Sequence, residues 1–162
     1  MIRFAVAFLA IMLMSPEVRA APQDVFHGQW TGEASDGSRV SFELDAAGDG
    51  FTVSLHHPLL GLEKTPFVPS ARPAVFEERR ERGLFSLFTG DESRNLHEGP
   101  ILWARFEGAS FILYRLDIGK DGRMTLDRFR LEPSGGATRM QVEHIENGAL
   151  AGGDELMLER RP

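Results

Sequence analysis

Turn signals built on glycine recur at short intervals along most of this 162-residue chain. The segments between them are rich in Val, Ile, Phe, Thr and Leu, and apolar residues often alternate with polar ones. Such alternation is typical of β-strands with one buried face, and no segment shows the 3.6-residue apolar period of a helix. Sequential hairpins therefore predict an all-β, antiparallel up-and-down meander that closes into a barrel of about eight to ten strands, in preference to a sandwich. The turns are Asp36-Gly37, Gly48-Asp49-Gly50, Gly108, Gly119-Lys120-Asp121-Gly122, Ser134-Gly135-Gly136 and Asn147-Gly148.

Two longer connections, Pro58–Pro73 and Gly90–Gly99, interrupt this meander. The first contains the apolar group Leu59-Leu60-Gly61-Leu62, which we expect to cover the open mouth of the barrel as a lid. The alternative is an exposed patch that docks a partner. The strands are expected at about His27–Ser35, Ser38–Asp45, Phe51–His57, Ala74–Glu78, Gly83–Thr89, Pro100–Glu107, Ala109–Ile118, Arg123–Glu132, Ala137–Glu146 and Asp154–Arg161.

The first twenty residues have the pattern of a secretory signal peptide. Arg3 supplies a positive charge, Phe4–Met14 is an unbroken apolar run, and Val18-Arg19-Ala20 places small residues where a signal peptidase acts. The run is shorter than the roughly 20 residues that span a bilayer. We therefore expect cleavage after Ala20, a single β-barrel domain over residues 21–162, and a periplasmic or secreted location.

Composition narrows the range of functions. The chain has no cysteine, which excludes disulfides, thiolate metal sites and cysteine nucleophiles. Its formal net charge of −6 argues against binding to nucleic acid, because the necessary excess of Lys and Arg is missing. The Gly-x-Ser-x-Gly, His-Glu-x-x-His and phosphate-loop motifs are also missing. We expect a protein that is not an enzyme and uses neither a metal nor a cofactor.

A short motif opens the first expected strand. It is Gly28-Gln29-Trp30, which follows the leader closely and precedes the string of hairpins. This arrangement resembles the calycin group of barrels, the lipocalin-like proteins and their relatives. In that group the Trp closes one end of the barrel and a basic residue near the last strand packs across it. The resemblance implies these roles for Trp30 and Arg160, and a cup-shaped barrel that binds a small molecule or a partner.

Alternation along the expected strands assigns side chains to the interior. Continuing the apolar phase of their strands brings in His57 and His144. The strand around Phe129 changes phase after Leu126, which predicts a bulge and leaves the direction of Arg128 and Arg130 open. Asp127 is interpreted as an ordinary acid on the strand surface. The apolar residues expected inside are Val40, Phe42, Leu44, Phe51, Val53, Leu55, Met140 and Val142.

Inward polar groups need partners, so they are the candidates for ligand contact. An arginine with two histidines would suit a carboxylate or another anion, although satisfied structural or rim residues are the simpler interpretation. The ligand-binding candidates are His57, Tyr114, His144 and one arginine, for which Arg128 is chosen with Arg105 and Arg130 as alternatives.

Two functions fit these features best. A third, an enzyme of barrel type that uses His57, Tyr114 or His144 as acid or base, is disfavoured because no nucleophile or acid/base pair is recognisable by spacing. The first is an exported, non-catalytic lipocalin-like barrel that binds a small apolar or amphipathic molecule. The alternative is a periplasmic protein-interaction module, an inhibitor or accessory subunit, whose barrel is filled by its own side chains. An enclosed void of roughly 300 Å³ or more would favour the first, and a filled interior the second.

Overall fold

The computed structural model describes residues 22–79 and 99–162, and within these ranges the chain is almost entirely β-structure. A short 3-10 helix, η1 (Pro22–Val25), precedes ten strands. The expected strand Gly83–Thr89 and most of the Gly90–Gly99 connection lie outside the described residues. The strands are β1 (Gly28–Glu33), β2 (Arg39–Ala47), β3 (Gly50–His57), β4 (Leu60–Pro69), β5 (Val75–Glu78), β6 (Ile101–Glu107), β7 (Ser110–Ile118), β8 (Met124–Ser134), β9 (Ala137–Glu146) and β10 (Ala149–Arg160).

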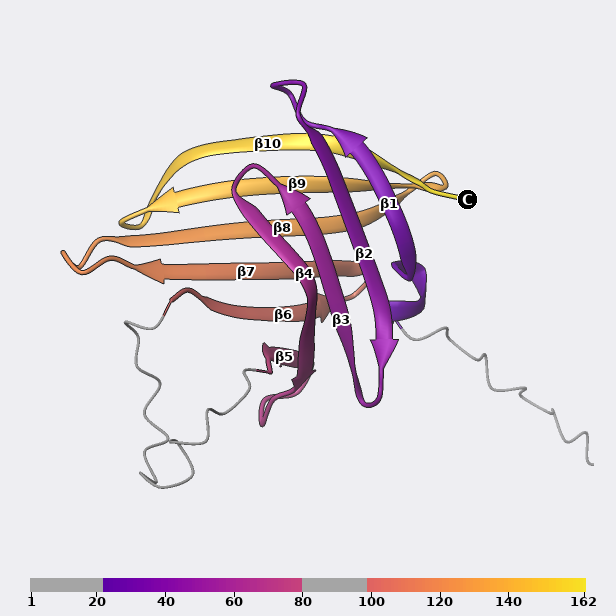
Figure 1. Cartoon of the computed structure of the whole chain (residues 1–162), viewed down its shortest axis with the longest axis horizontal. Coiled ribbons are helices and arrows are strands. Elements are labelled where there is room, and N and C mark those ends of the chain that lie inside the picture. The colour runs from indigo at the N-terminus through magenta and orange to yellow at the C-terminus, as the bar shows by residue number, and fades with distance from the viewer. Residues whose placement is uncertain (1–21, 80–98) are drawn as a thin grey trace, which may run out of the picture.

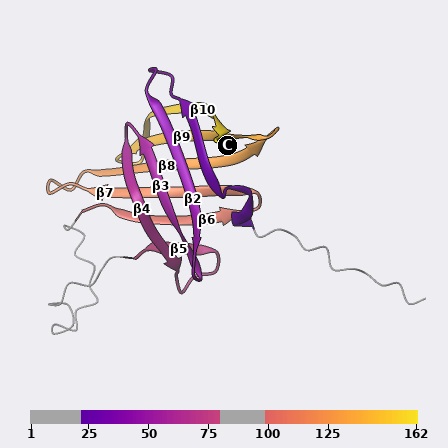
Figure 2. The same cartoon turned by 45° about the vertical axis from the view of Figure 1, so that its right-hand side comes forward.

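The strands form a closed antiparallel barrel in sequence order. Each pairs with its neighbours along the chain, and β1 pairs with β10 through Trp30 opposite Arg160 and Thr31 opposite Glu159. The predicted all-β, up-and-down barrel is confirmed. In Figure 1, β1–β4 cross steeply over β6–β10, and Figure 2 keeps the same two layers after rotation. The core therefore lies between two crossing layers of one continuous sheet.

The connection expected to form a lid is instead a strand of the wall. β4 pairs with β3 on one side and β5 on the other, and Leu60 and Leu62 are buried in the core. Their alternation fits a strand, and a register shift opposite Val53–Leu55 accommodates the irregular stretch before Pro66. The carbonyl of Pro66 accepts a hydrogen bond from the Arg79 amide at 2.8 Å, so the proline-containing segment still pairs. The lid prediction is wrong.

Phenylalanine rings fill much of the space between the layers. Phe51 lies at their centre, with ring centroids of four other phenylalanines between 4.8 and 5.7 Å away. All the apolar residues expected inside are buried, which confirms the alternation for β2, β3 and β9. The six most buried rings, each at most 1% exposed, are Phe26, Phe42, Phe51, Phe67, Phe111 and Phe129.

The two ends of the barrel differ in chemistry. We call the end at the β3–β4, β7–β8 and β9–β10 turns the mouth, and the opposite end, at η1, the closed end (Figure 1). Phe26 follows η1 and is fully buried against Phe111, with 6.1 Å between ring centroids. Apolar packing therefore covers the closed end, whereas the inward side chains near the mouth are largely polar.

Candidate functional site

A row of polar side chains crosses the inner face of the barrel near its mouth. Arg115 on β7, Asp127 on β8 and His144 on β9 are directly opposite one another in the register. They share the phase of Phe129 and other core residues, so they point inward. Asp117 and Glu146 are two residues further along β7 and β9 on the same face. We call these five residues the mouth cluster.

Asp127 is the centre of the mouth cluster and is 1% exposed. One carboxylate oxygen accepts a hydrogen bond from Arg115 Nη1 at 2.8 Å, and the other lies 2.5 Å from His144 Nδ1. Arg115 also contacts the Asp117 carboxylate at 3.3 Å, and His144 Nε2 lies 3.2 Å from Glu146 Oε1. Both oxygens of the buried acid are thus paired, which offsets the free energy lost when its charge leaves water.

His144 is held between two carboxylates. The hydrogen bond from its ring to Asp127 raises the pKa of His144 above the ordinary value of 6.5, and Glu146 acts in the same direction. Burial opposes this shift without reversing it. With an acceptor at each ring nitrogen, the imidazolium form can donate both of its N–H groups. The mouth cluster therefore favours a protonated histidine.

His57 occupies the facing layer at the same end of the barrel. Its ring packs edge-on against Phe129 with 5.3 Å between centroids. Its Nδ1 accepts a hydrogen bond from the Leu59 amide at 3.1 Å, so the neutral ring carries its proton on Nε2. That Nε2 atom is buried and has no hydrogen-bond partner among the described residues. Burial lowers the pKa of His57, although Asp154, Asp36 and Asp127 pull it upward.

Asp154 ties the last strand to the β1–β2 turn beside His57. Its Oδ2 accepts a hydrogen bond from the Ser35 amide at 3.0 Å. This bond is the leading cause that lowers the pKa of Asp154. The contact links residues 119 positions apart in sequence and fixes β10 against the rim of the other layer. An ionised carboxylate therefore accompanies His57 at the mouth.

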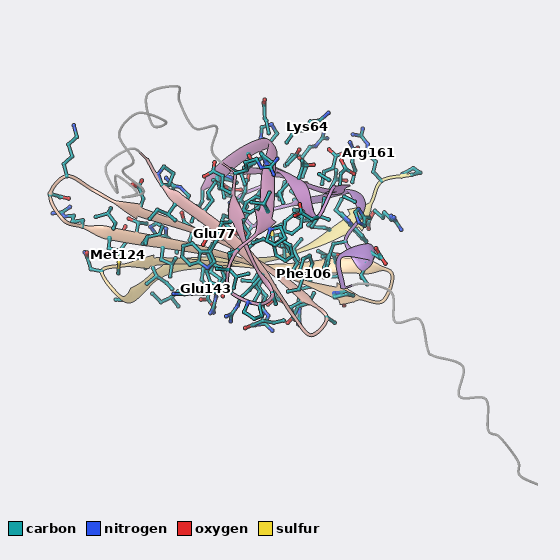
Figure 3. The ribbon with its side chains drawn as sticks, turned by 90° about the horizontal axis from the view of Figure 1, so that it is seen from below. Lys64, Glu77, Phe106, Met124, Glu143 and Arg161 are labelled. Carbon is teal, nitrogen blue, oxygen red and sulfur yellow. The ribbon has the colours of Figure 1, made fainter. Side chains whose placement is uncertain are left out.

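Two predicted ligand-binding residues lie on the outer face of the barrel. Tyr114 and Arg128 are directly opposite each other, but they alternate with the inward Leu113 and Phe129. Tyr114 stacks on Trp103 with 4.9 Å between ring centroids, and Arg128 pairs with Glu143 at 2.5 Å. Figure 3 places Glu143 on the side of the β6–β10 layer away from β1–β4. The inward orientation expected for Tyr114 and Arg128 is therefore wrong.

The alternative arginines also face outward. Arg105 pairs with Glu107, and Arg130 bonds Glu132 at 2.7 Å. Together with Arg139, Arg130 lowers the pKa of Glu132 to about 2, its own hydrogen bond being the larger cause. These ion pairs brace the outer surface of β6–β9. None of the three arginines considered from the sequence reaches the interior with His57 and His144.

Sequence reasoning missed Arg115 and Asp127, which are the inward arginine and the buried acid. The signal was present as strict alternation, since Arg115 follows Phe111 and Leu113 at two-residue steps. Asp127 precedes Phe129 at the same spacing. β8 pairs without a register shift on either side, so the predicted bulge is wrong and Asp127 is not a surface acid.

Trp30 and Arg160 meet where the barrel closes. The Arg160 guanidinium lies over the Trp30 ring, 5.6 Å from its centroid, and donates a hydrogen bond to the His27 carbonyl at 2.9 Å. Trp30 Nε1 donates to the Phe26 carbonyl at 3.0 Å. The indole is 5% exposed, so its polar edge is satisfied within the core. These contacts hold the first and last strands together beside the closed end.

A small pocket lies against β1–β3 near the C-terminal Arg161, and its volume is about 140 Å³. It is lined mainly by outward polar side chains, including Gln29, Thr31 and Glu43, and is not an interior cup. Among the described residues no group of three or more His, Asp or Glu side chains is placed to hold a metal ion. In the same part of the chain no helix is long and apolar enough to cross a membrane.

Comparison of the chain with protein-family models, with curated proteins and with solved structures found no match. The assignment of function therefore rests on the mouth cluster, His57 and the packing of the barrel.

Proposed function

We propose that the protein is an exported, non-catalytic barrel that binds a small neutral amphipathic molecule at its mouth. The observation that carries this proposal is the buried Nε2 of His57, which has no acceptor among the described residues. A buried donor without a partner costs about 1–3 kcal/mol, so an acceptor supplied by a bound molecule would recover that free energy. An ordered water is the alternative acceptor, and dye binding to a His57 variant separates the two.

The charges around His57 favour a neutral ligand over an anion. Asp154 and Asp127 interact electrostatically with the ring, and both would repel a carboxylate. Arg115 is engaged by Asp127 and Asp117 and offers no open fork to an anion. A carbonyl, ether or hydroxyl oxygen can accept from His57 Nε2 without this repulsion. We therefore propose a neutral ligand in place of the carboxylate that the sequence suggested for an arginine with two histidines.

The filled interior leaves no room for a ligand inside the barrel, so we place the ligand at the mouth. The phenylalanines between the layers occupy the volume that an apolar chain would need. Phe129 is fully buried and packs against His57 with 5.3 Å between ring centroids, so the surroundings of this donor are apolar. A molecule with one acceptor and a compact apolar part fits this pair of groups. The lipocalin-like resemblance, the secretory leader and the periplasmic or secreted location belong to the same proposal.

Nile red, a neutral amphipathic dye with a carbonyl acceptor, provides a direct probe. We expect saturable fluorescence enhancement with the native protein and about tenfold weaker binding to His57→Leu, since one hydrogen bond is worth about 1 kcal/mol or slightly more. The matched control is His56→Leu, because His56 is exposed and points away from the interior. Equal affinity of His57→Leu and native protein would assign the Nε2 donor to water and contradict the proposal.

Native mass spectrometry of protein purified from its own cells adds a test that needs no chosen probe. We expect an extra mass of a small molecule that is lost in His57→Leu and kept in His56→Leu. A bare protein mass, together with no saturable dye binding, would contradict ligand binding.

A protein-interaction module is the second candidate, and the ring-filled interior is the observation that favours it. Such a barrel would act through its surface as an inhibitor or accessory subunit. A native mass that contains a second protein, without any small molecule, would favour this function.

A further inference from the structure

Five aliphatic side chains form a continuous row on the outer face of the barrel. The register aligns them from β6 through β7, β8 and β9 to β10, with each residue directly opposite the next. With strands about 4.8 Å apart, this row is ~19 Å long. The outer apolar row consists of Ile101, Leu116, Leu126, Ile145 and Leu150.

The row points away from the barrel core. Its members alternate along their strands with inward residues such as Leu102 and Asp127, and none belongs to the buried core cluster. Four of them are part-exposed, and Leu150 is 69% exposed. Outward aliphatics scattered singly are ordinary, but five in register across five strands form a contiguous patch.

Further apolar groups border the outer apolar row on both sides. Trp103 and Tyr114 stack nearly parallel, 6° apart, on the side towards the closed end. Ile118 and Met124 are opposite each other on the side towards the β7–β8 turn. Met124 is 41% exposed and lies near that end of the long strands (Figure 3). These nine residues match the apolar centre of an interface in which about 20–30 residues a side take part.

We propose that the outer apolar row is the contact between two copies of this chain. The charged residues beside the row favour another protein as the partner of this face and argue against an anionic lipid membrane. Arg128 and Glu143 neutralise each other in an ion pair, and the whole chain has a net charge of −6. No excess of positive charge attracts a membrane. Because Arg128 and Glu143 compensate each other, a second copy meets no net charge from these two residues beside the row.

A twofold axis along the row makes this contact self-complementary. Each row then packs on its own copy, at the ~10 Å spacing of stacked sheets. The same axis places the Trp103–Tyr114 stack of one protomer over Ile118 and Met124 of its partner. Aromatic rings on a flexible methionine form a close-packed, apolar contact. The interface uses no free strand edge, since the barrel is closed.

The oligomeric state of the full chain tests this proposal. Sedimentation velocity from micromolar to about 100 μM protein should show a dimer, and Leu126→Asp should weaken it about 100-fold, as expected for a central apolar contact. Leu150→Asp is a second variant whose largely exposed site leaves the core untouched. The matched control, Leu59→Asp, makes the same change at an exposed leucine outside the row and should dimerise like the native chain.

Cross-linking locates the interface even if Leu126→Asp fails to fold. Because the native chain has no cysteine, Leu126→Cys carries a single thiol. A short bis-maleimide should join two copies of this variant but should not join copies of Leu59→Cys. A monomeric native chain at every concentration would overturn the proposal and assign the row to another occupant. A dimer that survives both aspartate substitutions would overturn it as well.

Discussion

Asp127 shows how one buried carboxylate can organise several neighbouring side chains. One of its carboxylate oxygens binds Arg115 and the other binds His144. Arg115 also contacts Asp117, and His144 also contacts Glu146, and both of these acids are more exposed. The charges therefore alternate from β7 to β9 across the mouth cluster. Such a network fixes the rotamers of its members, so the polar surface offered to a ligand is already ordered.

The stability of the protein should depend on pH through His144. Its raised pKa means that the folded chain keeps a proton which the unfolded chain releases near pH 6.5. The stabilisation is complete below pH 6.5 and is lost as the pH rises through the folded-state value. We therefore expect His144→Asn to be about 1 kcal/mol less stable than the native chain at pH 5.5, with a smaller difference at pH 8.5. Urea unfolding across this range measures it.

His57 should make the stability of the protein depend on pH in the opposite direction, and it serves as the comparison for His144. Its pKa is lowered, so the unfolded chain takes up a proton near pH 6.5 that the folded chain refuses, and stability falls as the pH drops. His57→Gln should remove this loss of stability at acidic pH.

For His144, a difference in stability between His144→Asn and native protein that stays constant with pH would contradict the prediction. It would show that Asp127 and Glu146 do not favour the charged ring.

At the scale of strands, β3 begins at a glycine that lies tightly against the backbone of β4. A Cβ atom added to Gly50 would stand 1.9 Å from the Phe67 carbonyl oxygen on β4. The adjacent pair, Phe51 opposite Phe67, is part of the ring-filled core. The atoms that an added methyl group would meet belong to the β4 backbone, and the Phe67 ring is packed in the core. β3 and β4 therefore cannot move apart without disturbing the core.

Gly50→Ala should destabilise the protein by about 3 kcal/mol, because the methyl group forces β3 away from β4. Gly61→Ala on β4 is the matched control, since no atom lies within 4 Å of the added Cβ. We expect it to be neutral or slightly stabilising through the reduced entropy of the unfolded chain. Chemical denaturation of both variants provides the measurement. Equal stabilities would mean that the β3–β4 pair tolerates separation.

The strands with one apolar face were predictable from the sequence, whereas strands with two apolar faces were not. β2, β3 and β9 alternate cleanly, and their inward residues were assigned correctly. On β7, Phe111 and Leu113 face the core while Ile112 and Leu116 face outward, so hydrophobicity alone did not identify the inner side. The inward face of β8 was misassigned for the same reason, because the apolar Leu126 faces outward and suggested a change of phase.

The candidate site followed the same rule. His57 and His144 were placed on the interior because their strands alternate cleanly up to the mouth. Tyr114 and Arg128 were misplaced with the phases of β7 and β8, and Arg115 and Asp127 were lost by the same error. Strand pairing across the sheet supplied the missing information, since it fixes each phase against a neighbouring strand.

At the scale of the whole molecule, closure of the barrel depends on a short seam. β1 and β10 share two register pairs, whereas β8 and β9 share ten. The Arg160 contacts with Trp30 and His27 reinforce the seam. These residues are about 130 positions apart, so they meet only after a large loop has closed. We infer that the seam forms late in folding.

Arg160→Leu should therefore speed unfolding about tenfold and leave the folding rate almost unchanged. The lost cation–π contact and hydrogen bond are together worth about 1.5 kcal/mol, and contacts that form after the transition state act on the unfolding rate. Stopped-flow kinetics in urea separate the two rates. Arg123→Leu, at an exposed turn position, should change neither. A folding rate that falls with stability would place the seam in the folding nucleus instead.

The position of the seam also decides how the molecule can be attached to something else. Gly28 and Arg160 leave the barrel together beside the closed end, and the Arg161 amide bonds the Gln29 carbonyl at 2.8 Å. The polar mouth lies at the other end (Figure 1). A label, a fused domain or a surface tether joined beside Gly28 or Arg160 would therefore hold the barrel by its base and present the mouth outward.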